Sequence, residues 1–141
     1  MTRAQDNFVR IEGFWHDLYQ QDFESLVSRF DPQGEYTDDV TPDDDVARGG
    51  AEITARLTLA FGKLAGLGDE RLHMVAGDDV VMTEHVERWE WPTGEKMALH
   101  VASVHEVGDG KIMRWRDYWD MNVLTAAAPS WWWDHVLQGW K

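Results

Sequence analysis

The chain has 141 residues, no cysteine, and 26 acidic against 13 basic side chains, which gives a formal net charge of −13. This charge opposes binding to nucleic acid or to an anionic membrane surface, and the lack of cysteine excludes disulfides, thiolate metal sites and a cysteine nucleophile. The length suits a single domain spanning 1–141, and because the N-terminus lacks the apolar run of a signal peptide, we expect a cytoplasmic protein.

Tryptophan is the unusual component of the composition. Nine residues are tryptophan, three of them consecutive at 131–133. Core packing needs few side chains of this size, and indole favours places with an apolar body and a polar edge, such as ligand cavities and interfaces. The tryptophans therefore indicate a bulky core with a dimer contact, a cavity for a hydrophobic and preferably aromatic molecule, or both.

Two helices are predicted at the N-terminus. Apolar residues recur at helical spacing over residues 4–20, which predicts an amphipathic helix. Asp22 is typical of an N-cap, and the apolar residues after it predict a second, short helix that ends at Asp31-Pro32.

An acidic segment follows at residues 34–45. Tyr36 and Thr37 favour a strand at its start, and the acidic, proline-containing remainder favours a loop. The loop lacks the glycine and the terminal glutamate of a calcium-binding loop, so we expect it to be solvated.

The rest of the domain is predicted to be a third helix and four strands. Helical spacing begins after Gly50, and we expect this helix to be closed by Gly66 and Gly68. Alternation then predicts four strands joined by turns that contain glycine: Leu72–Ala76, Val80–Trp91, Lys96–Val107 and Lys111–Met121. Helices followed by an antiparallel meander indicate an α+β domain, with the helices packed on one face of a curved sheet.

The tail, residues 125–141, is rich in tryptophan. After Pro129 helical spacing resumes, with Trp132, Val136 and Trp140 on one stripe. Such a segment suits either a cover over the mouth of a cavity or a contact with a partner subunit.

Two strands place ionisable residues among large apolar ones. Alternation puts Asp117 on the same face as four apolar residues, Met113, Trp115, Trp119 and Met121. It also puts His85 and Glu87 on the face that carries Trp89 and Trp91, opposite an apolar wall with one hydroxyl, made by Met97, Leu99, Val101 and Ser103. Removing such groups from water is costly, so each is either paired for structural reasons or placed for proton transfer. We favour proton transfer.

Together Asp117, Glu87 and His85 would form a general acid–base site in an apolar cavity. Neighbouring carboxylates separate in pKa, so that one stays protonated as an acid while the other ionises as a base, and histidine can take and return a proton near neutral pH. The alternative is a buried network that only stabilises the sheet. The other histidines lack metal-ligand spacing, so we expect no metal.

Four segments resemble a known family: EYTD at 35–38, ARGGAEI at 47–53, VMTEHVE at 81–87 and GKIMRWRDYWD at 110–120. Through them, residues 34–121 resemble the limonene-epoxide-hydrolase and SnoaL-like branch of the nuclear-transport-factor-like superfamily. The resemblance implies a cone-shaped, curved antiparallel sheet with helices packed on it, a cystatin-like α+β barrel roll, and a homodimer.

The resemblance also implies roles for single residues. Asp117 matches a general base that activates water, and Glu87 matches the acid that protonates the epoxide oxygen. Tyr36 and Asp38 match a tyrosine and an amide residue that hold the water. Three positions differ from the family pattern, because His85 replaces an arginine that bridges the two acids, Glu87 is longer than the usual aspartate, and Asp38 replaces the amide.

These differences favour a cofactor-independent lyase, dehydratase or isomerase that acts on a hydrophobic, preferably aromatic, small molecule. Asp117 and His85 would be base and acid, Glu87 would share the proton, and Tyr36 and Asp38 would complete the polar end. The expected substrate wall comprises Trp89, Trp115, Trp119, Leu99, Val101, Phe61 and Leu57. The alternatives are an epoxide hydrolase, with Asp117 as base and Glu87 as acid, and a binding or assembly domain without catalysis.

Overall fold

Five helices and six strands make up the computed structural model, which describes residues 1–141. In chain order they are α1 (Arg3–Tyr19), α2 (Phe23–Ser28), β1 (Phe30–Asp38), β2 (Ala47–Arg48), α3 (Gly49–Phe61), β3 (Gly66–Ala76), β4 (Val80–Glu90), β5 (Lys96–Gly108), β6 (Lys111–Tyr118), α4 (Met121–Ala127) and α5 (Ser130–Val136).

The first two helices form as their sequences predict. Thr2 and Gln5 form a capping box at the start of α1, and Asp22 caps α2 by accepting a hydrogen bond from the Ser25 backbone. The predicted end of α2 is wrong by a few residues, because the helix stops at Ser28 and Pro32 lies within β1.

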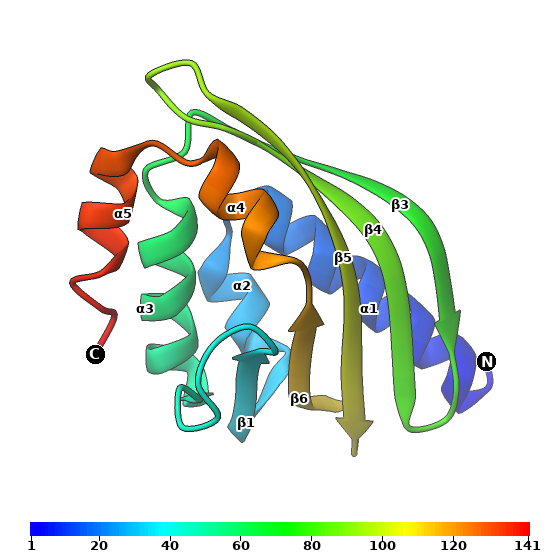
Figure 1. The fold of residues 1–141 in the computed structure, drawn as a ribbon. Helices are drawn as coiled ribbons and strands as arrows, with labels where there is room; N and C mark the ends of the chain where they lie inside the picture. Colours follow the sequence, from blue (N-terminus) through cyan, green and yellow to red (C-terminus); the bar gives the residue numbers. More distant parts are fainter.

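The strands form one six-stranded sheet in the order β2-β1-β6-β5-β4-β3. All neighbours are antiparallel except β1 and β6, which run parallel. In Figure 1 strands β3, β4 and β5 bend along their length, with α1 against one face and α3 beside α5 at the far end. The predicted α+β class with helices on a curved sheet is confirmed, whereas the purely antiparallel meander is not.

The junction between α3 and β3 differs from the prediction. The helix ends at Phe61 with Gly62 as its C-cap, and Gly66 and Gly68 belong to β3. This strand begins at Gly66 rather than Leu72 and pairs with β4 from Gly66 opposite Glu90 to Ala76 opposite Val81. Its first half carries two glycines and three charged residues, so apolar alternation does not reveal it.

The last strand also departs from strict alternation. The pairing of β5 with β6 shifts register between Glu106 and Val107. As a result Ile112 is buried and Met113 is 38% exposed, so Met113 does not share the face of Asp117. The strand ends at Tyr118, and Met121 begins α4, a helix that the sequence pattern did not predict.

The inner face of the sheet carries the ionisable residues expected there. His85 and Glu87 on β4 and Asp117 on β6 are 0%, 4% and 6% exposed. They lie beside a hydrophobic core that helices α1 and α3 share with the sheet. None of the helices combines the length and the apolar content needed to cross a lipid bilayer. The homodimer remains a prediction.

Candidate active site

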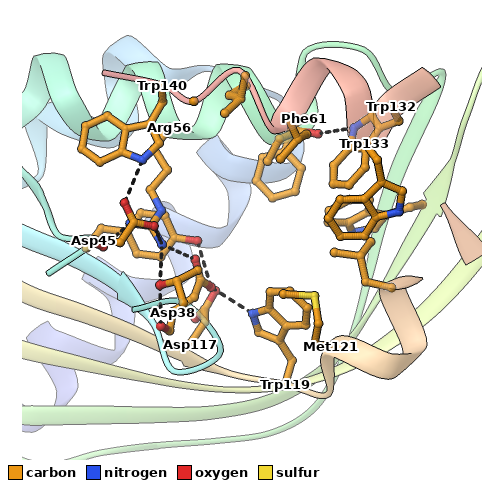
Figure 2. Close-up of a pocket in the computed structure, with 18 of the residues that line it drawn as sticks. Asp38, Asp45, Arg56, Phe61, Asp117, Trp119, Met121, Trp132, Trp133 and Trp140 are labelled. Atoms are coloured by element: carbon orange, nitrogen blue, oxygen red, sulfur yellow. Dashed lines mark hydrogen bonds and ion pairs between the residues drawn. The ribbon is translucent and has the colours of Figure 1, made fainter. Parts of the chain in front are cut away.

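A cavity of about 430 Å³ lies between the inner face of the sheet, α3, α4 and the C-terminal tail. Figure 2 shows that its polar and apolar groups are separated: Asp38, Asp45, Arg56 and Asp117 gather at one end, and Phe61, Trp132 and Trp133 lie at the other. This separation suits a hydrophobic molecule that carries one reactive polar group.

Asp117 is placed by its two neighbouring strands. Its Cα pairs with that of Ser103 on β5 and with that of Asp38 on β1. Oδ1 accepts hydrogen bonds from Ser103 Oγ at 2.6 Å and from Trp115 Nε1 at 2.7 Å. Oδ2 has no hydrogen-bond partner in the protein, and the residue lines the cavity. One carboxylate oxygen is therefore held, and the other is available to a bound molecule.

Glu87 is the second carboxylate on the cavity wall. Its Oε2 accepts a hydrogen bond from the Tyr19 hydroxyl at 2.7 Å, and its Oε1 accepts one from Trp89 Nε1 at 3.2 Å. Alternation along β4 places Glu87 and Trp89 on the same inner face, so the strand itself supplies the indole partner.

The pKa values of both carboxyls are raised. Burial raises the pKa of Asp117 well above its usual value, and the negative charges of Asp38 and Glu87 raise it further, against the lowering effect of the donors Ser103 and Trp115. Burial likewise raises the pKa of Glu87, while His85 and the donor Tyr19 act in the opposite direction. Both carboxyls therefore keep a proton at higher pH than an exposed carboxyl does.

Asp38 differs from these two carboxyls because it has a cationic partner. Arg56 on α3 donates to Asp38 Oδ2 at 2.9 Å, and Trp119 Nε1 donates to Asp38 Oδ1, also at 2.9 Å. The Tyr36 hydroxyl donates to the same Oδ1 at 3.3 Å. Burial and the negative charge of Asp38 raise the pKa of Tyr36 well above its usual value, so Tyr36 remains a hydrogen-bond donor.

Arg56 is a functional residue that the sequence analysis missed. Its side chain is 8% exposed, and it also donates to the Asp45 backbone carbonyl at 2.6 Å. The missed signal was its position: Arg56 lies on the apolar stripe of α3 that buries Ile53, Leu57 and Phe61. A charged residue on a buried stripe indicates a partner or a function, as it did for Glu87.

His85 lies outside the cavity, which corrects its expected role as an acid or base in contact with the substrate. Its side chain is fully buried and is not part of the cavity wall. Nε2 lies 2.9 Å from Ser103 Oγ, and Nδ1 lies 2.9 Å from Asp69 Oδ1 and 3.2 Å from the Tyr19 hydroxyl. Both ring nitrogens are thus occupied by protein partners that strand alternation alone does not reveal.

Four of the seven residues expected on the substrate wall line the cavity, and their contact with a substrate stays a prediction. Trp89, Trp119, Val101 and Phe61 line the cavity. Leu57, Leu99 and Trp115 are not part of the cavity wall and are buried within the hydrophobic core. Trp115, for example, stacks on Tyr36 with 3.7 Å between ring centroids and packs against Phe14 of α1.

The tail supplies the remaining wall. Trp132, Trp133, Val136 and residues 138–141 line the cavity. Trp132 donates to the Ala60 carbonyl at 3.3 Å, and Trp140 donates to Asp45 Oδ1 at 3.2 Å. The tail therefore lies along the cavity within the single chain, and its contact with a partner subunit stays a prediction.

Comparison with known proteins identifies the family. Residues 5–129 match the family model described as the limonene-1,2-epoxide hydrolase catalytic domain. The chain belongs to this family. The limonene-1,2-epoxide hydrolase family contains enzymes that convert small molecules, and membership confirms the resemblance stated above. A search of curated protein sequences gave no match.

Solved structures agree with this fold. An LEH-like epoxide hydrolase from M. tuberculosis is 23% identical, with a TM-score of 0.73 and coverage of 87% of this chain and 89% of that chain. Bal32a, from a soil-derived mobile gene cassette, is 19% identical, with a TM-score of 0.76 and coverage of 87% and 96%. A protein assigned as a SnoaL-like polyketide cyclase, from Jannaschia sp. CCS1, is 12% identical, with a TM-score of 0.78 and coverage of 89% and 94%. At these identities the likeness shows the fold alone.

Proposed function

We propose that this chain is an epoxide hydrolase that adds water to an epoxide on a hydrophobic small molecule. The observation that carries the proposal is the pair of carboxyls on the cavity wall, Asp117 and Glu87, of which Asp117 has one oxygen held by two donors and one without a partner in the protein. Membership of the limonene-1,2-epoxide hydrolase family supports the same reaction.

In the proposed reaction Asp117 is the general base. Its free Oδ2 takes a proton from a water molecule as the water oxygen forms a bond to one epoxide carbon. Because Ser103 and Trp115 hold Oδ1, the carboxylate is fixed in orientation while Oδ2 acts. The polar group formed by Tyr36, Asp38 and Trp119 lies at the same end of the cavity and can bind the water.

Glu87 is the proposed general acid. As the bond between the attacked carbon and the epoxide oxygen breaks, Glu87 gives its proton to that oxygen, and the product is a diol. An acid needs its proton at working pH, and burial raises the pKa of Glu87 in the required direction. Burial raises the pKa of Asp117 as well, so the base is assigned from contacts: Asp117 has an oxygen without a protein partner, whereas both oxygens of Glu87 accept hydrogen bonds. The two carboxyls end the reaction with their protonation states exchanged, so one proton must return from Asp117 to Glu87 before the next turnover.

A lyase, dehydratase or isomerase is the second candidate. The two carboxyls with raised pKa could also move a proton within a substrate without consuming water. The placement of His85 behind the wall weakens this candidate, since it removes the imidazole as a direct proton donor. A binding domain without catalysis is disfavoured by two carboxyls kept at a cavity without cationic partners of their own.

Oxygen-18 water separates these candidates. The protein is incubated with a panel of apolar epoxides, including limonene 1,2-epoxide and an aryl epoxide, in labelled water, and the products are analysed by mass spectrometry. The proposal expects one labelled oxygen in each diol and no diol above background from Asp117→Asn. Consumption of the substrate without label in the product would favour an isomerase or a lyase, and no consumption of any epoxide would overturn the proposal.

A further inference from the structure

The cavity reaches the surface of the protein at the very end of the chain. All but three of the residues that line it are buried or half-buried. The three exposed ones are Gln138, Gly139 and Lys141, and half-buried Trp140 lies among them. A molecule that enters the cavity from solvent therefore meets residues 137–141, which we call the end segment.

One side chain fastens the end segment to the rest of the protein. Trp140 Nε1 donates a hydrogen bond to Asp45 Oδ1 at 3.2 Å, and its ring centre lies 6.0 Å from the Arg56 guanidinium carbon. Figure 2 shows this contact at the polar end of the cavity. It is the only side-chain hydrogen bond that the end segment makes, so the position of the segment depends on Trp140.

The acceptor of this hydrogen bond is itself fixed. Arg56 donates to the Asp45 backbone carbonyl at 2.6 Å and lies 3.5 Å from Asp45 Oδ2. These contacts hold Asp45 on α3 without any help from Trp140. Asp45 is therefore the fixed partner of the contact, and the end segment is the part that can move.

The backbone beside Trp140 makes a turn that only glycine adopts readily. Gly139 has a φ of +83°, which lies in the left-handed region that favours glycine. A Cβ at this position would meet no atom within 4 Å. Glycine is therefore needed here for its backbone conformation rather than for space, and the turn brings Trp140 onto the cavity wall.

We propose that Trp140 is a gate at the entrance of the cavity: its hydrogen bond to Asp45 holds the gate closed, and rotation of the backbone at Gly139 opens it. In the open state the end segment leaves Asp45, and a molecule enters at the polar end of the cavity. The gate lies beyond residues 5–129, which match the family model. Because the proposal concerns access to the cavity, it does not rest on the proposed reaction.

Thiol labelling measures the opening without a substrate. The chain has no cysteine, so Val101→Cys places a single thiol on the cavity wall, at a position that is 3% exposed. The probe is dithiodipyridine, a neutral aromatic disulfide. The thiolate attacks one of its sulfur atoms, a mixed disulfide forms, and a coloured thiopyridone is released. If the thiol is reached only through the open gate, the rate of colour formation reports how often the gate opens.

Trp140→Phe keeps an aromatic ring and removes the hydrogen bond to Asp45. In the Val101→Cys protein we expect it to raise the labelling rate about 5-fold or more. Trp131→Phe is the matched control, because Trp131 lies in the same tail, donates to Thr93 Oγ1 at 2.9 Å and does not line the cavity. This control should leave the rate unchanged, and equal rates in the two variants would overturn the proposal.

Urea distinguishes the gate from general unfolding. Opening of the end segment exposes little surface, so the labelling rate should rise only slightly with urea below the unfolding transition. A labelling rate that rose with urea as steeply as the unfolded fraction would show that the thiol is reached by unfolding, which overturns the proposal.

Gly139→Ala tests the turn. Alanine is strained at a positive φ, and opening releases the strain, so we expect labelling of Val101→Cys to rise about 5-fold or more. Gly94→Ala is the matched control, because Gly94 also has a positive φ, +101°, and open space around its Cβ position, but lies between β4 and β5. A rate for Gly139→Ala no higher than that for Gly94→Ala would contradict the opening at Gly139.

These outcomes are distinct from the failure of the proposed function. If no epoxide is hydrolysed while labelling responds to Trp140→Phe and Gly139→Ala as expected, the epoxide hydrolase proposal fails and the gate stands. If an epoxide is hydrolysed while labelling is insensitive to both substitutions, the gate is wrong and the hydrolase proposal stands.

Discussion

At the scale of single residues, the site depends on differences between chemically similar side chains. Asp38 and Asp117 occupy paired positions on adjacent strands, yet Asp38 has Arg56 as an ionic partner and Asp117 has only neutral donors. Neighbouring aspartates can therefore serve separate purposes in one cavity.

Asp117→Asn should separate activity from stability. The amide cannot take a proton from water, so we expect hydrolysis to fall by about 100-fold or more. Because folding raises the pKa of Asp117, this residue contributes stability below its unfolded pKa and loses that contribution as pH rises through its folded pKa. The melting temperature of the variant should thus equal that of the wild-type protein at low pH and exceed it at pH 8.

The matched control for this variant is Asp39→Asn, an exposed position one residue beyond Asp38. It should change neither the rate nor the pH dependence of the melting temperature, both followed in parallel with Asp117→Asn. A marked loss of folding in Asp117→Asn at pH 8 would contradict the catalytic assignment and favour a structural role.

His105 should make the fold sensitive to acid. Its ring is fully buried, neither nitrogen has a hydrogen-bond partner, and burial lowers its pKa from 6.5 to about 3. The unfolded chain therefore binds a proton that the folded chain does not, and stability that is complete above pH 6.5 is lost as pH falls. One residue of this kind costs about 2 kcal/mol at pH 5.

We expect His105→Leu to reduce the loss of unfolding free energy between pH 7.5 and pH 5 by about 2 kcal/mol, as measured by urea unfolding at the two pH values. His100→Leu, at an exposed position on the same strand, controls for the removal of a histidine. Equal pH dependence in His105→Leu and the wild-type protein would show that the ring is not kept neutral by the fold.

At the scale of elements, α3 is tied to the acidic loop by one side chain. Arg56 reaches Asp38 at the end of β1 and the backbone of Asp45 in the loop, and its guanidinium lies 4.9 Å from the centre of the Tyr36 ring. The loop is thus anchored at its acidic end, although its composition predicted only a solvated segment.

Arg56→Met should destabilise the protein strongly, because removal of one partner leaves the other as an unpaired and nearly buried charge. The expected cost is about 3–5 kcal/mol by urea unfolding, and the double variant with Asp38→Asn should recover a large part of it. Arg48→Met is the control, since this arginine is 64% exposed and pairs with Glu35 on the surface, where the expected cost is about 1 kcal/mol or less.

The tail should contribute to substrate binding. Most of it, from residue 130 on, lies beyond the family match, which ends at residue 129, and its indoles line the cavity. Trp133→Ala removes part of this wall far from the carboxyls, so we expect KM for the epoxide to rise about 10-fold with a small change in kcat. Leu137→Ala, at a side chain that is 77% exposed, should leave both constants unchanged; a fall in kcat alone for Trp133→Ala would contradict this role.

Local pattern predicts strand faces well and long-range pairing poorly. Alternation along β4 was enough to bring Glu87 to the inner face, and the same reasoning held for Asp117. Alternation could not show that His85 would lie outside the cavity with its Nδ1 already in contact with protein groups. Those groups, Tyr19 and Asp69, lie on other elements. Nor could it show the exposure of Met113, which results from a register shift against the neighbouring strand.

At the scale of the whole molecule, the sheet brings together groups that are distant in sequence. Most contacts between strands join neighbours in the chain, but β1 pairs in parallel with β6 across about 80 residues, and this pairing places Asp38 beside Asp117. Parallel neighbours need a long connection, and here the connection contains α3, β4 and β5, which supply part of the cavity wall. The family fold was recognisable from short segments, whereas this pairing was not.

The β1–β6 pairing makes the polar end of the cavity a late product of folding. A chain in which β3, β4, β5 and β6 have already formed their sequential hairpins still lacks the Asp38 carboxylate and the Tyr36 hydroxyl, because closing so long a loop is slow. Partly folded forms without this pairing would therefore keep much of their sheet, with Asp117 and Glu87 on it, but would lack the side of the cavity that Tyr36 and Asp38 supply.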